Sequence, residues 1–382
     1  MASPDEHHDK PGATARPLGL HVIQALSFTM THFQLPYLRF RFSSPSQIHH
    51  VPSQYQCRVC QETGDHPRWL ARDLRYRSGE KFEYFQCHHC GCLQIAKIPG
   101  NIGDFYPSDY YSHQPLSSRR WQDSPLKARF RAAGRRLGLS TSPSARLVRR
   151  WLRTATHHSW LRAAGVSRRD ARILDVGCGS GALLLRMHKE GYTHAEGIDP
   201  LIPHDIHFPN GLVIRKAELA DLPCTVPYDF IMMHHSLEHV PDQLGTLRNV
   251  AQRLGDNGRA LVRIPLAHYA WEHYRTDWVQ LDPPRHLYLH TETSFRRIAE
   301  QAGLRLLSVV YDSYEFQFCG SELCRLGIPI PEHRHYLQQQ RDPRFSRRQQ
   351  RRWSREAKRL NDTGQGDMAC FYLAPKSAPP ER

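Results

Sequence analysis

The sequence of 382 residues predicts an α/β protein: a mostly parallel, nucleotide-binding sheet preceded by a small metal-binding module. Three observations predict this fold class. A glycine-rich turn follows an apolar run within residues 173–181. Apolar runs then alternate with helix-like patterns over the rest of the chain, as they do in α/β folds. Two Cys-x-x-Cys pairs lie upstream of both features.

The glycine-rich turn has the composition of a nucleotide-binding loop. Asp175 follows an apolar pair, and glycines occupy positions 177, 179 and 181. Glycine has no Cβ, so the backbone there can approach a ligand closely. Asp199 ends the next apolar segment, where a carboxylate can accept hydrogen bonds from both ribose hydroxyls. The spacing predicts a strand–turn–helix–strand unit that binds a nucleotide.

The acid before the first glycine bears on which nucleotide binds. Dinucleotide folds usually show Gly-x-Gly-x-x-Gly and place a diphosphate on the helix N-terminus. Here the spacing is Gly-x-Gly-x-Gly, and Asp175 would repel a diphosphate but suits a cationic ligand. The pattern resembles motif I of class I S-adenosylmethionine-dependent methyltransferases, over residues 165–375. The resemblance implies S-adenosylmethionine as cofactor, whose methionine end carries an ammonium and a sulfonium.

Seven strands are expected in the Rossmann-like sheet that this resemblance implies. The first two carry the glycine turn and Asp199, and the third spans 212–214. The fourth, with the turn after it, is expected within 228–240, and the others at 259–264, 304–311 and 368–373. Because the first five alternate with helical patterns, we expect a parallel sheet covered on both faces.

The resemblance also implies a set of cofactor-binding residues. In the family, the loop after the third strand, residues 216–223 here, flanks the adenine. The implied residues are Asp175, Gly177, Cys178, Gly179, Gly181, Asp199, Ala217, Glu218 and His234.

The two cysteine pairs predict a structural zinc ribbon. Cys57 and Cys60 form the first pair, Cys87 and Cys90 the second, with 26 residues between them. Each pair can point two thiolates at one ion, and two pairs complete a tetrahedron around zinc. A site closed by four thiolates has no open position, so we expect it to be structural. His88, His89 and Cys92 crowd the second pair and are alternative ligands.

An aromatic segment, Tyr-Pro-x-x-Tyr-Tyr at residues 106–111, follows the cysteine pairs. A zinc ribbon, this segment, a linker and a methyltransferase core together resemble a bacterial group of surface-polysaccharide and sugar methyltransferases. The layout is also similar to that of the C-methyltransferases of nucleotide-linked sugars. The resemblance implies that the ribbon helps to close the substrate pocket; alternatively, these aromatics only pack the ribbon onto the core.

One candidate catalytic group follows the fourth strand. His235, Glu238 and His239 could share one face of a helical turn. Some quinone-pathway O-methyltransferases carry an acid where His235 stands, and there the cluster is associated with a divalent metal. Three roles are therefore open for this group: metal binding, a polar or cofactor-side role, and base catalysis by His235 or His239.

The second candidate lies in the segment Asp-Pro-Pro-Arg-His at residues 282–286. His286 corresponds by pattern to the histidine proposed as the base in the sugar C-methyltransferases, which makes it the leading general base. Those enzymes carry an acid before the histidine, whereas this chain carries Arg285, which could bind a substrate phosphate or carboxylate. The alternative is a loop histidine that anchors the helix beginning after Thr291.

The net charge of +15 is concentrated in two segments. Residues 113–170 hold fourteen Lys and Arg against two acids, and residues 333–360 hold ten against two. These segments are either solvated helices or a patch for phosphate-bearing ligands. We therefore divide the chain into a disordered extension (1–50), zinc ribbon and aromatic segment (51–112), basic helical linker (113–168) and methyltransferase domain (169–382) with a basic helical insertion near 332–360.

The functional hypothesis is S-adenosylmethionine-dependent methyl transfer to a sugar, a nucleotide-linked sugar or a related small metabolite, at oxygen or carbon. The alternative is an RNA methyltransferase of the rRNA type, in which ribbon and basic linker dock nucleic acid. No apolar run is long enough to span a membrane, and the zinc-type cysteines fit a reducing cytoplasm. The acceptor atom and the oligomeric state stay open.

Overall fold

The computed structural model describes residues 54–74, 79–106, 112, 125–149, 156–329 and 342–377. The chain divides into two compact units, residues 1–45 and 46–382, and all described residues belong to the second. The expected N-terminal extension and most of the Tyr-Pro-x-x-Tyr-Tyr segment lie outside the described residues.

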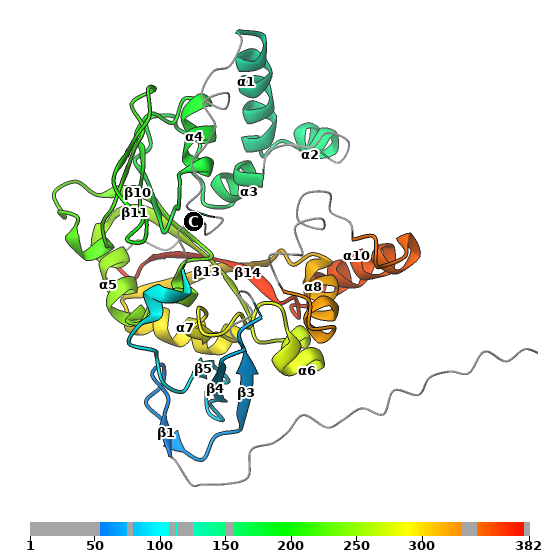
Figure 1. The fold of residues 1–382 in the computed structure, drawn as a ribbon. Helices are drawn as coiled ribbons and strands as arrows, with labels where there is room; N and C mark the ends of the chain where they lie inside the picture. The colour runs from blue at the N-terminus through cyan, green and yellow to red at the C-terminus, as the bar shows by residue number, and fades with distance from the viewer. Residues whose placement is uncertain are drawn as a thin grey trace, which may run out of the picture. The chain divides into compact units, whose positions relative to one another are not determined.

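The second unit is built on an eight-stranded sheet (Figure 1) with the order β13-β14-β11-β10-β6-β7-β9-β8. Neighbouring strands pair in parallel from β11 through β9, while β14 runs antiparallel between β11 and β13. The bounds are β6 Ile173–Val176, β7 Ala195–Ile198, β8 Ile206–His207, β9 Val213–Arg215, β10 Tyr228–His234, β11 Leu254–Pro265, β13 Leu304–Tyr311 and β14 Met368–Pro375.

This sheet confirms the predicted fold class. All seven expected strands are present, and the short strand β8 adds an antiparallel edge beside β9 that the sequence analysis did not predict. Strand β8 is only two residues long and contains no apolar run, so its sequence carries no recognisable strand pattern.

Both faces of the sheet are buried, and successive strand residues alternate between two hydrophobic clusters. Leu174 and Ile231 face one cluster, with side chains from α5 (Gln243–Arg253) and α7 (Glu292–Gln301). Ile173 and Phe230 face the other, with α3 (Thr156–Ala163) and α4 (Ala182–Lys189). The parallel pairing of β11, β10, β6, β7 and β9 brings the carboxyl ends of these strands to one edge.

A second, four-stranded sheet has the order β12-β5-β4-β3. Its strands β3 (Arg68–Arg72), β4 (Lys81–Gln86) and β5 (Leu93–Ile95) come from the cysteine-containing segment. The fourth, β12 (Tyr288–Leu289), comes from the chain directly after His286 and pairs antiparallel with β5. A hairpin of β1 (Tyr55–Gln56) and β2 (Thr63–Gly64) carries the first cysteine pair. The small sheet therefore takes one strand from the segment between β11 and β13, and it shares a hydrophobic core with the large sheet.

The other described α-helices either precede the large sheet in the sequence or connect its last three strands. They are α1 (Pro125–Leu139), α2 (Pro143–Arg149), α6 (Tyr269–Tyr274), α8 (Phe316–Arg325) and α10 (Arg347–Asp362). Ser346 caps α10, whose Trp353 and Leu360 are buried while its arginines face outward. Among the described residues, no helix combines the length and apolar character needed to cross a bilayer.

Candidate functional site

The glycine turn between β6 and α4 has the conformation that its glycines allow. The φ angles of Gly177, Gly179 and Gly181 are all positive, at 77°, 55° and 78°. A Cβ at position 177 would lie 2.4 Å from the Ser236 Cβ, and one at position 179 would lie 2.4 Å from the Ser112 carbonyl oxygen. Only glycine fits where the chain turns this tightly against other segments.

Two carboxylates lie beside this turn. Asp199 accepts backbone hydrogen bonds from Gly179 N (2.8 Å) and Leu201 N (2.9 Å), which fixes its orientation. Asp175 is buried, and its Oδ1 has no hydrogen-bond partner among the described residues. Burial, together with the charge of Asp199, raises the pKa of Asp175 to about 8. A buried carboxylate oxygen without a partner is the group that a cationic ligand would satisfy.

A cavity of about 1140 Å³ opens over the turn. Eight of the nine predicted cofactor-binding residues line it, namely Asp175, Gly177, Cys178, Gly179, Asp199, Ala217, Glu218 and His234. Gly181 does not, because it lies at the start of α4 against the side chain of Ile214. Tyr106 and Ser112, which precede the linker, also line the cavity.

His234, at the end of β10, is covered by a residue from the linker. The Trp160 ring of α3 lies 4.0 Å from the His234 ring, between centroids, and the Arg263 guanidinium lies 6.0 Å from the centroid of Trp160. Burial and the nearby Arg263 hold the pKa of His234 well below its usual range, so the ring is neutral. Nothing in the sequence pointed to Trp160, because it lies some seventy residues from His234 and carries no motif.

His235 is separated from His239, against the expectation that both share a face with Glu238. Its Nδ1 lies 3.2 Å from Glu238 Oε1, and Arg263 donates to its Nε2. Burial and the charge of Arg263 lower the pKa of His235 to about 3. With both nitrogens occupied, His235 is poorly placed to act as a base.

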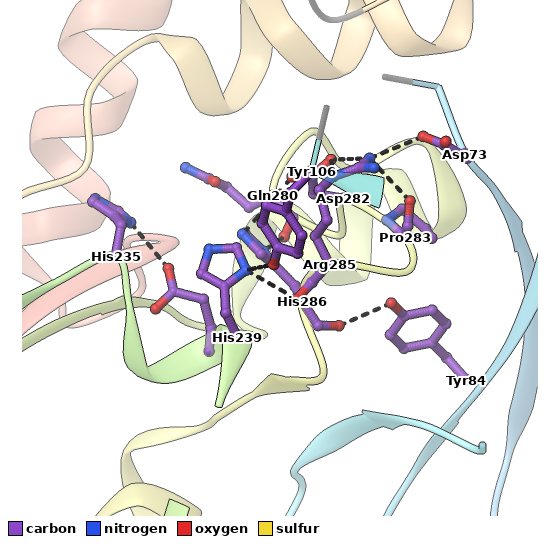
Figure 2. Close-up of polar contacts among 11 residues, drawn as sticks. Asp73, Tyr84, Tyr106, His235, His239, Gln280, Asp282, Pro283, Arg285 and His286 are labelled. Atoms are coloured by element: carbon purple, nitrogen blue, oxygen red, sulfur yellow. Dashed lines mark hydrogen bonds and ion pairs between the residues drawn. The ribbon is translucent and has the colours of Figure 1, made fainter. Parts of the chain in front are cut away.

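His239 lies instead beside His286, with ring centroids 4.7 Å apart (Figure 2). The Nδ1 of His239 is 2.9 Å from the Arg285 carbonyl oxygen and 2.9 Å from the Tyr106 hydroxyl. The Nδ1 of His286 is 2.6 Å from the Gln280 carbonyl oxygen. Since a carbonyl only accepts, both Nδ1 atoms carry the proton, which leaves each Nε2 as the basic nitrogen.

The pair differs in its access to the cavity. His239 lines it, and burial and the neighbouring His286 lower the pKa of His239 to about 4. His286 is buried behind His239 and is not among the lining residues. One donor atom from each of Glu238, His239 and His286 lies within 4.8 Å of the others, so this trio, rather than the expected His235 group, has spacing suited to a metal ion.

Arg285 does not face a substrate, which overturns the expectation that it could bind a phosphate or carboxylate. The side chain is fully buried and donates to Asp73 Oδ1 (2.9 Å) and Asp282 Oδ1 (2.7 Å) (Figure 2). A buried guanidinium needs such partners, because removing the charge from water is costly. Arg285 therefore ties the His286 loop to the small sheet.

The small sheet holds this loop at two further points. The Tyr84 hydroxyl of β4 donates to the His286 carbonyl oxygen at 2.8 Å. Thr291 caps α7, as expected from the sequence, and its hydroxyl also donates to the Cys90 carbonyl oxygen at 2.9 Å. Removing the small sheet would release the segment that carries His286.

The four predicted cysteines converge in space. Cys57 and Cys90 have sulfurs 3.6 Å apart, those of Cys60 and Cys87 are 3.5 Å apart, and all four lie within 4.8 Å of one another. These separations are close to the ~3.8 Å expected around a tetrahedral ion with Zn–S bonds of about 2.3 Å. Cys92, His88 and His89 do not join this cluster.

Comparisons with known proteins show which family and which proteins this chain is similar to. Residues 148–309 match the family model described as a methyltransferase domain. The chain is 30% identical over 149 residues to the ubiquinone biosynthesis O-methyltransferase of Aeromonas salmonicida (strain A449), covering 35% of this chain and 62% of the relative. It is 31% identical over 104 residues to the tRNA U34 carboxymethyltransferase of Aliarcobacter butzleri (strain RM4018), covering 25% of this chain and 34% of that one.

The chain thus spans less than two thirds of the length of either relative. A solved structure, a putative sarcosine dimethylglycine methyltransferase from Galdieria sulphuraria, is 17% identical with a TM-score of 0.37, covering 66% of this chain and 98% of that one. That similarity is too low to support an argument about function. The sheet and the family match together identify a class I S-adenosylmethionine-dependent methyltransferase domain.

Proposed function

We propose that this chain, through its methyltransferase domain, transfers a methyl group from S-adenosylmethionine to a sugar, a nucleotide-linked sugar or a related small metabolite. The observation that carries the proposal is the cavity, which has the unpaired Asp175 carboxylate on one side and His239 and Tyr106 on another. Its volume of about 1140 Å³ exceeds that of common single-ligand pockets, so it has room for a cofactor and a small acceptor.

The residues present fit this cofactor. Asp175 would receive the α-ammonium, and Asp199 the ribose hydroxyls. The backbone of the glycine turn would lie against the methionine part of the cofactor, and Ala217 and Glu218 would flank the adenine. When bound, S-adenosylmethionine supplies an electrophilic methyl group. The protein would supply alignment of the acceptor with that methyl, which is the main source of rate in such a transfer.

Proton removal from the acceptor is assigned to the histidine pair. The buried His286 is the leading base, with its Nε2 basic and its Nδ1–H held by the Gln280 carbonyl oxygen. His239 lines the cavity beside His286, and its own Nε2 is the second candidate to accept that proton. Tyr106, hydrogen-bonded to His239, would orient the acceptor. The acceptor atom is an oxygen or a carbon made nucleophilic by this deprotonation.

RNA methylation is the second candidate, and helix α10 favours it. Seven cationic side chains of this helix are exposed, namely Arg347, Arg348, Arg351, Arg352, Arg355, Lys358 and Arg359. Such a row can contact a phosphate backbone. The tRNA-modifying relative lends this candidate further weight.

One experiment separates the two candidates. Purified protein is incubated with methyl-labelled S-adenosylmethionine and either the small-molecule fraction or the total RNA of a bacterial extract. Label in the small-molecule fraction, absent with Asp199→Ala protein, supports the proposal. Label in RNA alone would contradict it and favour the second candidate.

Asp175 predicts a pH dependence of cofactor binding. Its pKa is raised to about 8, so it is protonated in the free protein near pH 7, and an ammonium ligand must displace that proton. Affinity should rise up to about tenfold per pH unit between about pH 6 and 7, where the cofactor ammonium stays charged. Calorimetry in buffers of different ionisation enthalpy should detect the released proton, and Asp175→Asn should abolish the release.

The contribution of Asp175 to folding stability changes with pH in the opposite direction. An acid whose pKa is raised in the folded state favours folding while it is protonated. Its contribution is therefore lost as the pH rises from about 4, the unfolded value, to about 8. A stability of the cofactor-free protein that increased over this range through Asp175 would contradict the assignment.

We also propose that the four cysteines hold one structural zinc ion, as expected for a reducing cytoplasm. Purified protein should contain this zinc, and Cys57→Ser combined with Cys60→Ser should lose it and lower the thermal midpoint. Cys224→Ser is the matched control, because Cys224 is exposed and remote from the cluster. Zinc retained at the thiolate site of the double variant would refute the ribbon.

A further inference from the structure

Besides the four cysteines and the trio of Glu238, His239 and His286, a further cluster of metal-ligand side chains lies between the linker and the methyltransferase sheet. His157 and His158 belong to α3, and Glu190 follows the last turn of α4. Glu190 Oε2 lies 3.0 Å from Nε2 of His157 and 2.6 Å from Nε2 of His158. The four-cysteine site of the small sheet uses none of these residues.

The geometry of the two histidines is unusual for a simple ion pair. Consecutive residues of an α-helix point about 100° apart, so they normally face different neighbours. Here both rings turn their Nε2 atoms toward one carboxylate oxygen, and the ring centroids are 4.4 Å apart. The three side chains therefore hold their potential ligand atoms close together, as a metal-ligand set requires.

The cluster is also almost completely buried. The exposed fractions are 1% for His157, 2% for His158 and 6% for Glu190. Both Nδ1 atoms lack a hydrogen-bond partner among the described residues, so hydrogen bonds alone leave the two rings half satisfied. A buried carboxylate needs a positive charge or hydrogen-bond donors in contact with it.

We propose that His157, His158 and Glu190 bind a divalent transition-metal ion, zinc by preference, through two Nε2 atoms and one carboxylate oxygen. Two imidazoles and a carboxylate are a common zinc donor set, completed by a water molecule. Bonds of about 2.0–2.1 Å place tetrahedral ligands about 3.3 Å apart, so the present contacts need to open by only about 0.3–0.7 Å.

The role of this ion would be structural. It would fasten α3, which otherwise joins the sheet through Leu161 and the rings of its histidines, to the end of α4. The same helix carries Trp160, which covers His234 of the cofactor cavity. The metal would therefore hold one wall of that cavity in place.

Cobalt substitution tests the proposal on the full-length protein. Chelator-stripped protein is titrated with Co²⁺, because cobalt bound to thiolates gives intense near-ultraviolet charge transfer, whereas cobalt bound to imidazole and carboxylate gives only weaker visible bands. We expect about two bound ions per chain, of which only one shows charge transfer. One class of spectrum belonging wholly to thiolates, in folded protein, would overturn the proposal. The result does not depend on methyltransferase activity, so failure here leaves the proposed function untouched.

Variants locate the second ion. Glu190→Gln and His158→Gln should each remove the non-thiolate cobalt spectrum and lower the zinc content, measured by mass spectrometry, by about one per chain. His188→Gln is the matched control: His188 is also buried and lies in α4, but it bonds the Ala195 carbonyl oxygen and is outside the cluster. Unchanged metal content in folded Glu190→Gln protein would show that the cluster is a metal-free hydrogen-bonded contact and would overturn the proposal.

Discussion

Replacing Asp199 with alanine is expected to weaken S-adenosylmethionine binding by about 100-fold or more. Each hydrogen bond to a charged group contributes about 1.5–3 kcal/mol, and the carboxylate would receive two from the ribose. Asp199 also accepts from Gly179 N and Leu201 N, so its loss loosens the glycine turn itself. Calorimetric titration with S-adenosylmethionine and with S-adenosylhomocysteine measures the effect.

Two further variants sharpen this result. Asp199→Asn keeps an oxygen that can accept from the turn, so its loss of affinity should be smaller than that of alanine. Asp170→Ala removes an exposed carboxylate outside the cavity and should leave binding unchanged. Affinity that is unaltered in Asp199→Ala would mean that the ribose binds elsewhere, and the proposed cofactor site would be wrong.

Replacing His286 with alanine should lower turnover by about 10²–10⁴-fold, the usual contribution of a general base. Cofactor affinity should stay within about twofold, because His286 lies behind His239 and outside the lining of the cavity. The measurement is single-turnover methyl transfer to the acceptor identified by labelling, with cofactor binding measured in parallel. His273→Ala, at an exposed histidine, serves as the control.

His286→Gln separates catalysis from packing. Glutamine fills much of the same space and can still donate to the Gln280 carbonyl oxygen, but it cannot accept a proton near neutral pH. If turnover is restored by glutamine, His286 only positions the loop. Turnover retained in both variants would assign the base to His239, which lines the cavity, before His235, whose nitrogens are occupied.

Local patterns were sufficient to predict the parallel sheet and many of the residues that line the cavity over the glycine turn. The glycine turn, Asp175 and Asp199 follow from short-range spacing, because a strand, a tight turn and a helix start are each encoded within a few residues. Eight of the nine implied cofactor residues line one cavity for this reason. The four cysteines were also predictable from local spacing. Each pair needs only one tight turn, and the two turns then need to lie side by side.

Residues whose role depends on distant partners were beyond this kind of prediction. Arg285 has the composition of an anion-binding residue, yet Asp73, more than two hundred positions away, buries and neutralises it. His235 and His239 are close in sequence, but they have different partners. Arg263 donates a hydrogen bond to His235, whereas His239 packs beside His286. Strand β12 is two residues long and exists only because β5 is beside it.

The sequence by itself determined the strand–glycine turn–helix–strand unit, the positions of seven strands along the chain and the two cysteine pairs, because each is encoded over a few neighbouring residues. Only the tertiary structure decided which histidines share a site, that the small sheet holds the His286 loop, and that His157, His158 and Glu190 meet. The physical reason is that packing brings together side chains from segments far apart in the chain, and burial then sets their charge state and their partners.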